Sequence, residues 1–244
     1  MAKASKDRRA VVEQMRKEQQ RAEKRRTAAI IAGASVVALV IIGAGAYPLI
    51  VDSRNKGELE RTDLAALGVS ADAASCTDPV AEEAEGNNDH REPGSVLEYS
   101  SSPPAAGPHY PDWAPMTRKF YTAEDRPPLG QLVHNLEHGY NILWYDETIA
   151  GDEEKLKVVE DIAGKFPGTD FENKFIAAPW TSDDGDPFPE GASIALTHWS
   201  MGGTNGNPKG QHGITQYCGE PSGEAVAAFV EAYPYTDSPE PGAS

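Results

Sequence analysis

Hydrophobic residues are most concentrated between positions 28 and 51, where 24 consecutive residues carry no charge. As a helix rising ~1.5 Å per residue, this stretch would reach about 36 Å, more than the ~30 Å hydrocarbon core of a bilayer. Ten Lys and Arg residues precede it, against four acidic residues. Because basic flanks remain in the cytoplasm, we expect one transmembrane helix at 28–51, a basic cytoplasmic arm at 1–27 and an extracytoplasmic remainder.

A cleaved signal peptide is the alternative, since Ala44-Gly45-Ala46 resembles a small-residue cleavage site. The long charged region before the hydrophobic run, and the length of that run, favour an anchor that stays in the cell membrane. With either interpretation, the folded part of the chain is expected outside the cytoplasm.

After the hydrophobic stretch, irregular segments give way to alternating strand and helix periods. We expect a stalk and linker at 52–93, with a short helix near 57–67, because residues 70–93 are rich in Ala, Asn, Pro and acidic residues. A compact domain is expected at 94–235. The polar, Pro-containing segment 236–244 is expected to be a disordered tail.

Within this domain, short β-branched and aromatic runs alternate with 3.6-residue periods. We expect strands at 95–99, 140–145, 174–178 and 192–198. We expect helices at 129–138, 152–166 and 224–232, the first ended by Gly139 and the second capped by Asp152. About four strands interleaved with about three helices predict an α/β or α+β domain with a central sheet.

The charge balance narrows the range of partners. The chain has 22 basic and 38 acidic residues, and residues 27–244 hold 12 and 34 of these, a net charge of −22. Such an acidic domain repels nucleic acid, so no nucleic-acid partner is expected. The acidity is compatible with cation capture, although it also serves to solvate an exported surface. The basic arm is expected to lie against the anionic inner leaflet.

The chain has two cysteines, Cys76 and Cys218. In an oxidising compartment such a pair indicates a disulfide, which would constrain the unfolded chain by about 5 kcal/mol in the chain-entropy account. The alternative is that Cys218 supplies a thiolate to a metal.

The most informative motif is His-Asn-Leu-Glu-His at 134–138. His134 and His138 are one helical turn apart, so their imidazoles share a face and can converge on one point. Leu132 and Leu136 lie on the opposite face. If the leucines pack on the sheet, the histidines face a cleft, solvent or the Pro-rich loop, which favours a binding site over a core role.

Three further residues extend this motif into a candidate metal site. Glu137 can ligate a metal or orient an imidazole, and His90 and His109 lie upstream in loops. Converging imidazoles suit zinc or copper, so the candidate ligands are His134, His138, His109, His90 and Glu137. The alternative is a set of scattered surface histidines, with His138 favoured at a helix C-terminus by the dipole.

The later histidines are weaker candidates. His198 ends the strand expected at 192–198, and Met201 follows it. Both could be copper ligands, but as core and strand-end residues they need no such role. His212 is weaker still. The Gly-rich loop at 202–213 has no phosphate-binding spacing and does not open a helix.

His-x-x-Glu-His is also the signature of inverted zinc peptidases. Those enzymes need a helix that continues beyond the motif to a distal carboxylate, whereas Gly139 is expected to end this helix at once. This favours a binding protein over an enzyme and leaves the enzyme question open, with a zinc hydrolase as the less favoured alternative.

Several motifs in a fixed order resemble a known family: His90, then Pro-Ala-Ala-Gly-Pro-His-Tyr at 104–110, then Leu-Val-His-Asn-Leu-Glu-His-Gly at 132–139, then a strand ending Trp-Tyr at 144–145. The chain is similar over residues 70–235 to a mainly actinobacterial family, the domain of unknown function family numbered 3105. The resemblance implies one membrane anchor and an outer α/β-type domain, and it supplies no activity. Ala106 stands where the family pattern has serine, so no hydroxyl-dependent role is expected of this loop.

These patterns lead to one hypothesis and one alternative. The chain is expected to be a single-pass, membrane-anchored extracytoplasmic protein that binds zinc or copper through its His-x-x-Glu-His helix. The alternative is a non-enzymatic envelope interaction module, or an accessory subunit, with a protein partner in the envelope.

Overall fold

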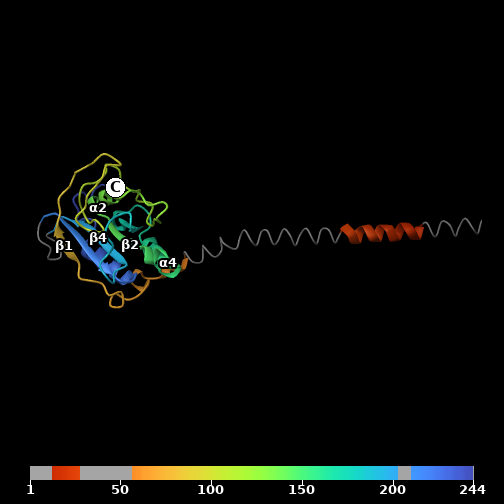
Figure 1. Ribbon diagram of the computed structural model, residues 1–244. Coiled ribbons are helices and arrows are strands. Elements are labelled where there is room, and N and C mark those ends of the chain that lie inside the picture. Colours follow the sequence, from red (N-terminus) through yellow and green to blue (C-terminus); the bar gives the residue numbers. More distant parts are fainter. Residues whose placement is uncertain (1–12, 28–56, 203–209, 244) are drawn as a thin grey trace, which may run out of the picture. The chain divides into compact units, whose positions relative to one another are not determined.

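The computed structural model of the chain describes residues 13–27, 57–202 and 210–243 (Figure 1). Two units can be distinguished, Met1–Glu58 and Leu59–Ser244. In the first, residues 13–27 form an exposed helix. The expected span at 28–51 lies outside the described residues, and no helix among those described combines the length and apolar character needed to cross a membrane.

The second unit is built on a mixed sheet. Its strands within the described residues are β1 (Val80–Glu83), β2 (Asn141–Tyr145), β3 (Phe175–Pro179), β4 (Ile194–Ser200) and β5 (His212–Cys218). Their order across the sheet is β1-β5-β4-β2-β3. β2 and β3 are parallel, with Leu143 opposite Ala177, and the other neighbouring pairs are antiparallel. The prediction of a mixed α/β domain is confirmed, with five strands in this sheet.

Helices pack against both faces of the sheet. They are η1 (Leu64–Ala66), α2 (Leu129–Glu137), α3 (Glu147–Ala150), α4 (Glu153–Gly164), η2 (Phe171–Asn173) and α5 (Gly223–Ala232). Because side chains alternate along a strand, Leu143 and Tyr145 of β2 enter one core, which also holds apolar residues of α4 and α5. Ile142 and Trp144 enter a second core beneath α2. The helices predicted at 129–138, 152–166 and 224–232 are therefore present.

The C-terminal end of α2 is locked by its own backbone. Gly139 adopts φ +94°, its N–H donates to Leu136 O (3.0 Å), and the N–H of Tyr140 donates to Asn135 O (3.1 Å). These two bonds are the Schellman pattern, which satisfies the last carbonyls of a helix. A Cβ at Gly139 would lie 2.5 Å from Tyr235 O. The predicted helix stop is confirmed, and it holds the His-x-x-Glu-His motif at a rigid helix end.

The strand predicted at 95–99 is wrong. This segment forms no strand, and its backbone and side chains instead contact Tyr110 and α2. The hydroxyl of Tyr110 donates to Ser95 O (2.8 Å). The side chain of Leu97 lies 2.7 Å from the position that a Cβ on Gly130 would take, so the segment packs against α2. Val96, the most strand-like residue, is 90% exposed.

Two strands, β1 and β5, were not expected. β1 is short and exposed along its whole length, as edge strands often are, and it pairs with β5 at the edge of the sheet. The predicted disulfide between Cys76 and Cys218 is confirmed, and it joins the segment before β1 to the end of β5. The composition of residues 70–93 is typical of a linker, so it does not indicate the pairing of β1 with β5.

The C-terminal segment lies against α2. Asp237 and Ser238 are each 4% exposed, and the N–H of Glu240 donates to Glu137 O (2.9 Å). The ammonium of Lys174 donates to the carbonyls of His138, Pro241 and Ala243. These backbone contacts fasten the segment beside the helix end (Figure 1).

Candidate metal centre

Helix α2 presents its two faces to different surroundings. Leu132 and Leu136 are fully buried in the core on the sheet, as expected from their spacing. His134 and His138 lie on the other side and are also buried, with 3% and 2% of their surface exposed. Loops cover them, because Nδ1 of His134 donates to the carbonyl of Tyr110 (2.5 Å) in the Pro-rich loop.

A short pairing of two loops brings the upstream histidines together. His90 and His109 form an isolated parallel bridge. The N–H of Arg91 donates to His109 O (2.7 Å), and the N–H of His109 donates to Asp89 O (3.1 Å). The next residue, Tyr110, donates its N–H to Gly130 O in α2. The backbone thus places both loop histidines against the helix.

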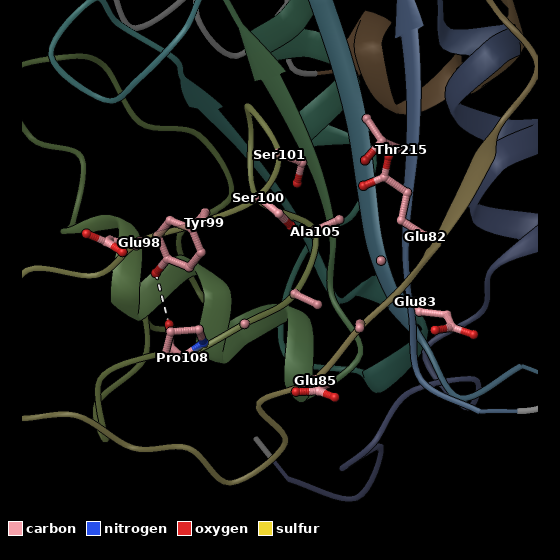
Figure 2. Close-up of a pocket in the computed structure, with 14 residues that line it drawn as sticks. Glu82, Glu83, Glu85, Glu98, Tyr99, Ser100, Ser101, Ala105, Pro108 and Thr215 are labelled. Atoms are coloured by element: carbon pink, nitrogen blue, oxygen red, sulfur yellow. Dashed lines mark hydrogen bonds between the residues drawn. The ribbon is translucent and has the colours of Figure 1, made fainter.

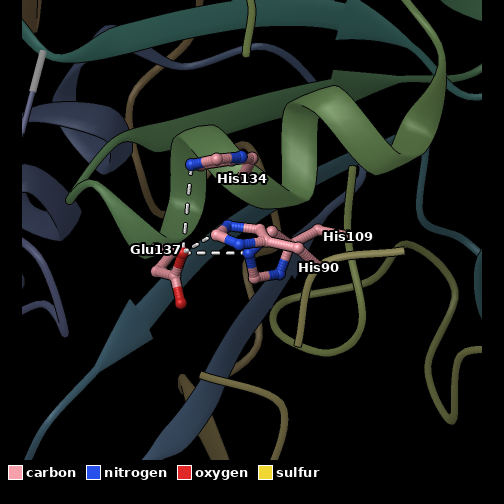
Figure 3. A group of neighbouring side chains, drawn as sticks. All are labelled: His90, His109, His134 and Glu137. Carbon is pink, nitrogen blue, oxygen red and sulfur yellow. Dashed lines mark ion pairs between the residues drawn. The ribbon is translucent and has the colours of Figure 1, made fainter. Parts of the chain in front are cut away.

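Four side chains converge on one point (Figure 3). Oε2 of Glu137 lies 2.9 Å from Nε2 of His109 and 4.0 Å from Nε2 of both His90 and His134. One ligand atom from each residue lies within 4.8 Å of the others. Two residues come from α2 and two from loops that precede it. This buried His/Glu cluster could hold a metal ion.

In His109 and His134, the imidazole nitrogen that faces away from the cluster, Nδ1, is bonded to the backbone. Nδ1 of His109 donates to Gly107 O (2.9 Å), and Nδ1 of His134 donates to Tyr110 O. With the hydrogen at Nδ1, a neutral imidazole has its lone pair at Nε2, the atom that faces Glu137. Metal-binding histidines usually have this carbonyl contact, because it sets the tautomer and the ring direction.

Nε2 of His109 and Oε2 of Glu137 are buried, yet neither has a hydrogen-bond partner within the described part of the chain. They lie 2.9 Å apart and form an ion pair when His109 is protonated. Both side chains are 0% exposed, so bulk solvent does not reach them. A neutral His109 with its hydrogen at Nδ1 would set the Nε2 lone pair against Oε2 of Glu137, a costly arrangement in a buried site that a proton or a metal cation between the two atoms removes.

The surroundings keep the imidazoles of α2 neutral. Burial lowers the pKa of His134, and burial with the neighbouring His134 lowers the pKa of His138 to about 4. Both rings are therefore neutral at neutral pH, each with one unprotonated nitrogen, the form that binds metal.

The Glu137 carboxyl is kept ionised. Burial would raise its pKa, but His109 and the N–H of Asn88 (2.6 Å from Oε1) outweigh this and lower it. For His109, burial is likewise outweighed, and the adjacent Glu137 carboxylate raises the pKa of the imidazole. An anionic oxygen thus lies among the imidazole nitrogens.

His138 belongs to a second group. Its Nε2 lies 2.9 Å from Nε2 of His134 and 3.8 Å from Oε2 of Glu240. Ligand atoms of Glu137, His138 and Glu240 lie within 4.8 Å of one another, apart from His90 and His109. The sequence did not indicate Glu240, because it lies in a polar C-terminal segment about a hundred residues from α2.

The weaker candidates lie in neither group. His198 is fully buried in β4, with its ring nitrogens 3.2 Å from Tyr140 O and Asp237 O, a structural role. Nδ1 of His212 donates to Gly210 O (2.8 Å). Met201 is 41% exposed. Cys218 is in the disulfide, so it has no thiolate to offer.

Aromatic rings border the cluster. Trp113 lies 5.1 Å from the ring of His134 and 4.8 Å from that of His138. Trp199 meets His109 edge-on at 5.9 Å. Trp199 is fully buried, whereas Trp113 is 42% exposed and the side chain of His90 is 41% exposed. Of the rings that border the cluster, His90 and Trp113 are thus the ones that solvent reaches.

A separate pocket of about 300 Å³ lies beside β1 (Figure 2). Its lining includes four exposed glutamates, Glu82, Glu83, Glu85 and Glu98. Tyr99 closes one side by donating its hydroxyl to Pro108 O (3.1 Å). No histidine is among its lining residues in the described part of the chain, so it is distinct from the metal cluster.

One family matches the chain: its description reads "Protein of unknown function (DUF3105)", and the match covers residues 90–244. This range includes every residue of the His/Glu cluster. Neither the curated proteins nor the solved structures contain a match.

Proposed function

Because the chain belongs to the DUF3105 family, a family of unknown function, we propose its function from the site: it binds a zinc or copper ion through His90, His109, His134 and Glu137. The observation that carries this proposal is the buried contact between Nε2 of His109 and Oε2 of Glu137, 2.9 Å apart and without hydrogen-bond partners among the described residues.

The donor set narrows the choice of metal. Three imidazole nitrogens and one carboxylate oxygen suit zinc in tetrahedral geometry, and copper also accepts imidazole. Calcium and magnesium prefer sets made of oxygen alone. A transition metal is therefore the expected occupant.

The accessibility of the ligands indicates a site that exchanges its metal. Three ligands are buried, while the His90 side chain is 41% exposed. Movement of His90 alone would open one coordination position without disturbing α2. We therefore favour a protein that takes up and gives up a metal.

Binding is favoured over hydrolysis because of how Glu137 is held. Oε1 accepts from Asn88 N–H, and Oε2 faces His109 and His134. A general base needs a carboxylate oxygen free to accept a proton from water, whereas Oε1 of Glu137 accepts from Asn88 and Oε2 is assigned to the metal in this proposal.

We place this site outside the cytoplasm, on a chain anchored by residues 28–51. The disulfide between Cys76 and Cys218 supports this placement, since disulfides persist in oxidising compartments. The basic arm before the hydrophobic stretch supports the same orientation.

Metal analysis of the full-length chain, purified in detergent without a polyhistidine tag, tests the proposal. The variant is His109→Gln, and the matched control is His212→Gln. In both histidines Nδ1 donates to the carbonyl two residues earlier, but only His109 faces Glu137. We expect wild type and the control to retain zinc or copper and His109→Gln to lose it.

Equal metal content in His109→Gln and wild type would overturn the proposal. A wild-type chain that takes up neither metal would also overturn it, and would favour an interaction module or accessory subunit in the envelope.

A further inference from the structure

We propose that the site holds two metal ions, with Glu137 as the shared carboxylate and with His138 and Glu240 completing the second position. This inference rests on the function proposed above, because it adds a second ion to the same site. Nothing in the family description assigns a metal to either position.

The first argument is spacing. Atoms bound to one ion at about 2.1 Å lie no more than about 4.2 Å from each other. The candidate ligand atoms fall into two sets, one with His90, His109 and His134 and the other with His138 and Glu240, with Glu137 in both; the atoms of each set lie within 4.8 Å of one another, and no one set of that spread holds all six residues. Two ions held about 3.5–4 Å apart by a common carboxylate are a known arrangement in proteins.

The second argument is that buried ligand atoms lack partners. Oε2 of Glu137 has no hydrogen-bond partner among the described residues, and neither does Nδ1 of His138. Nε2 of His138 lies 2.9 Å from Nε2 of His134. Since His134 carries its hydrogen at Nδ1, any hydrogen between these atoms comes from His138. With that hydrogen on Nε2, the lone pair of His138 lies at Nδ1, the buried nitrogen without a partner, and is available to an ion.

The third argument is that Glu240 is held in place before any ion binds. Its backbone N–H donates to Glu137 O (2.9 Å). The ammonium of Lys174 bonds to His138 O (2.7 Å) and to the carbonyls of Pro241 and Ala243 just beyond Glu240. The end of α2 and the C-terminal segment are thus fastened together, with the side chains of His138 and Glu240 3.8 Å apart.

The same lysine makes the second position the weaker one. The Lys174 ammonium is 2.7 Å from His138 O, so a second cation would approach an existing positive charge. The Glu240 side chain is 35% exposed, which lets water compete for the ion. We therefore expect the second ion to bind at least tenfold more weakly than the first.

Zinc stoichiometry of the full-length chain, measured by equilibrium dialysis against zinc alone, tests this inference. We expect two zinc ions per wild-type chain and one in Glu240→Gln. Glu231→Gln, the same change on the exposed surface of α5, is the control and should still bind two. Near-ultraviolet circular dichroism verifies that the variants fold.

Copper provides an independent measurement that does not depend on how firmly the C-terminal segment folds in the variant. Two Cu²⁺ ions bridged by Glu137 should couple magnetically, so the wild-type paramagnetic resonance signal should integrate to fewer spins than the bound copper. Fully uncoupled copper in a wild-type chain loaded with two ions would overturn the shared carboxylate.

The outcomes separate this inference from the function beneath it. A wild-type chain that saturates at one zinc ion, or a Glu240→Gln variant that still binds two, overturns the second position and leaves the first. A wild-type chain that binds no zinc and no copper overturns both.

Discussion

Glu137 is the residue on which the whole cluster depends. It is fully buried, it contacts histidines from two loops and its own helix, and it is kept ionised by Asn88 and His109. A buried carboxylate without a compensating cation or proton is costly. The sequence indicated Glu137 through the spacing of the motif, because i, i+3 and i+4 positions share a helix face.

Replacing Glu137 by Gln should weaken zinc binding by more than about 100-fold, since even residues behind metal ligands contribute about 10–100-fold. The amide keeps the size of the side chain but loses its charge. Competition with a chromophoric zinc chelator measures the change. Zinc affinity equal to wild type, together with loss of a hydrolytic activity, would contradict this role and support the hydrolase alternative.

His198 lies outside the cluster and permits a separate test of burial. Burial lowers the pKa of this imidazole below 6.5, so the folded protein holds it neutral. The unfolded chain takes up a proton below that value. The free energy of unfolding contributed by this residue should therefore decrease as pH falls below about 6.5, by up to about 1.4 kcal/mol per pH unit.

Urea unfolding of wild type and His198→Gln between pH 7 and 5 measures this effect. The difference in unfolding free energy between the two should shift in favour of the variant as the pH falls. A difference that is constant across this range would show that His198 becomes protonated equally in both states.

At the scale of elements, the site depends on how α2 ends. The helix ends at Glu137 with His138 as its C-cap, and the Schellman turn at Gly139 sends the chain into β2. The close approach of Tyr235 O to Gly139 then brings the C-terminal segment toward the helix end.

Substituting Gly139 by Ala should lower the free energy of unfolding by more than the same change at Gly168. Both glycines have positive φ, +94° and +72°, so both variants incur backbone strain of about 1–2 kcal/mol. Only at Gly139 would the new Cβ also meet a carbonyl oxygen, whereas nothing lies within 4 Å at Gly168. Thermal unfolding of the two variants measures the difference. Equal losses would show that the C-terminal segment moves away freely.

Elements with local signals could be predicted from the sequence, and elements that depend on distant partners could not. The cap of α4 at Asp152 and the turn at Gly139 involve only nearby residues. β1 instead exists through its pairing with β5, more than a hundred residues away. The approach of Glu240 to His138 depends on Lys174, whose ammonium donates to backbone carbonyls of both segments. Such bonds leave no pattern in the sequence.

At the scale of the whole molecule, we propose a membrane anchor and an outer metal-binding domain. The disulfide confirmed between Cys76 and Cys218 closes most of the second unit into one loop. The acidic composition of the chain after its basic arm favours cation capture at such a surface.

Reporter fusions test this orientation. Alkaline phosphatase joined after Ser244 should be active, because it folds only in an oxidising compartment. Green fluorescent protein joined at the same position should not fluoresce, because it is exported unfolded by the general secretory route. A dark phosphatase fusion with a bright fluorescent fusion would place the domain in the cytoplasm and contradict the proposed topology.

The most direct test of the central claim is anomalous X-ray diffraction at the zinc edge from crystals of the chain grown with zinc. We predict a peak about 2.1 Å from Nε2 of His109 and from Oε2 of Glu137, with His134 and His90 completing the coordination. No peak between His109 and Glu137, with zinc found only at surface carboxylates, would contradict it.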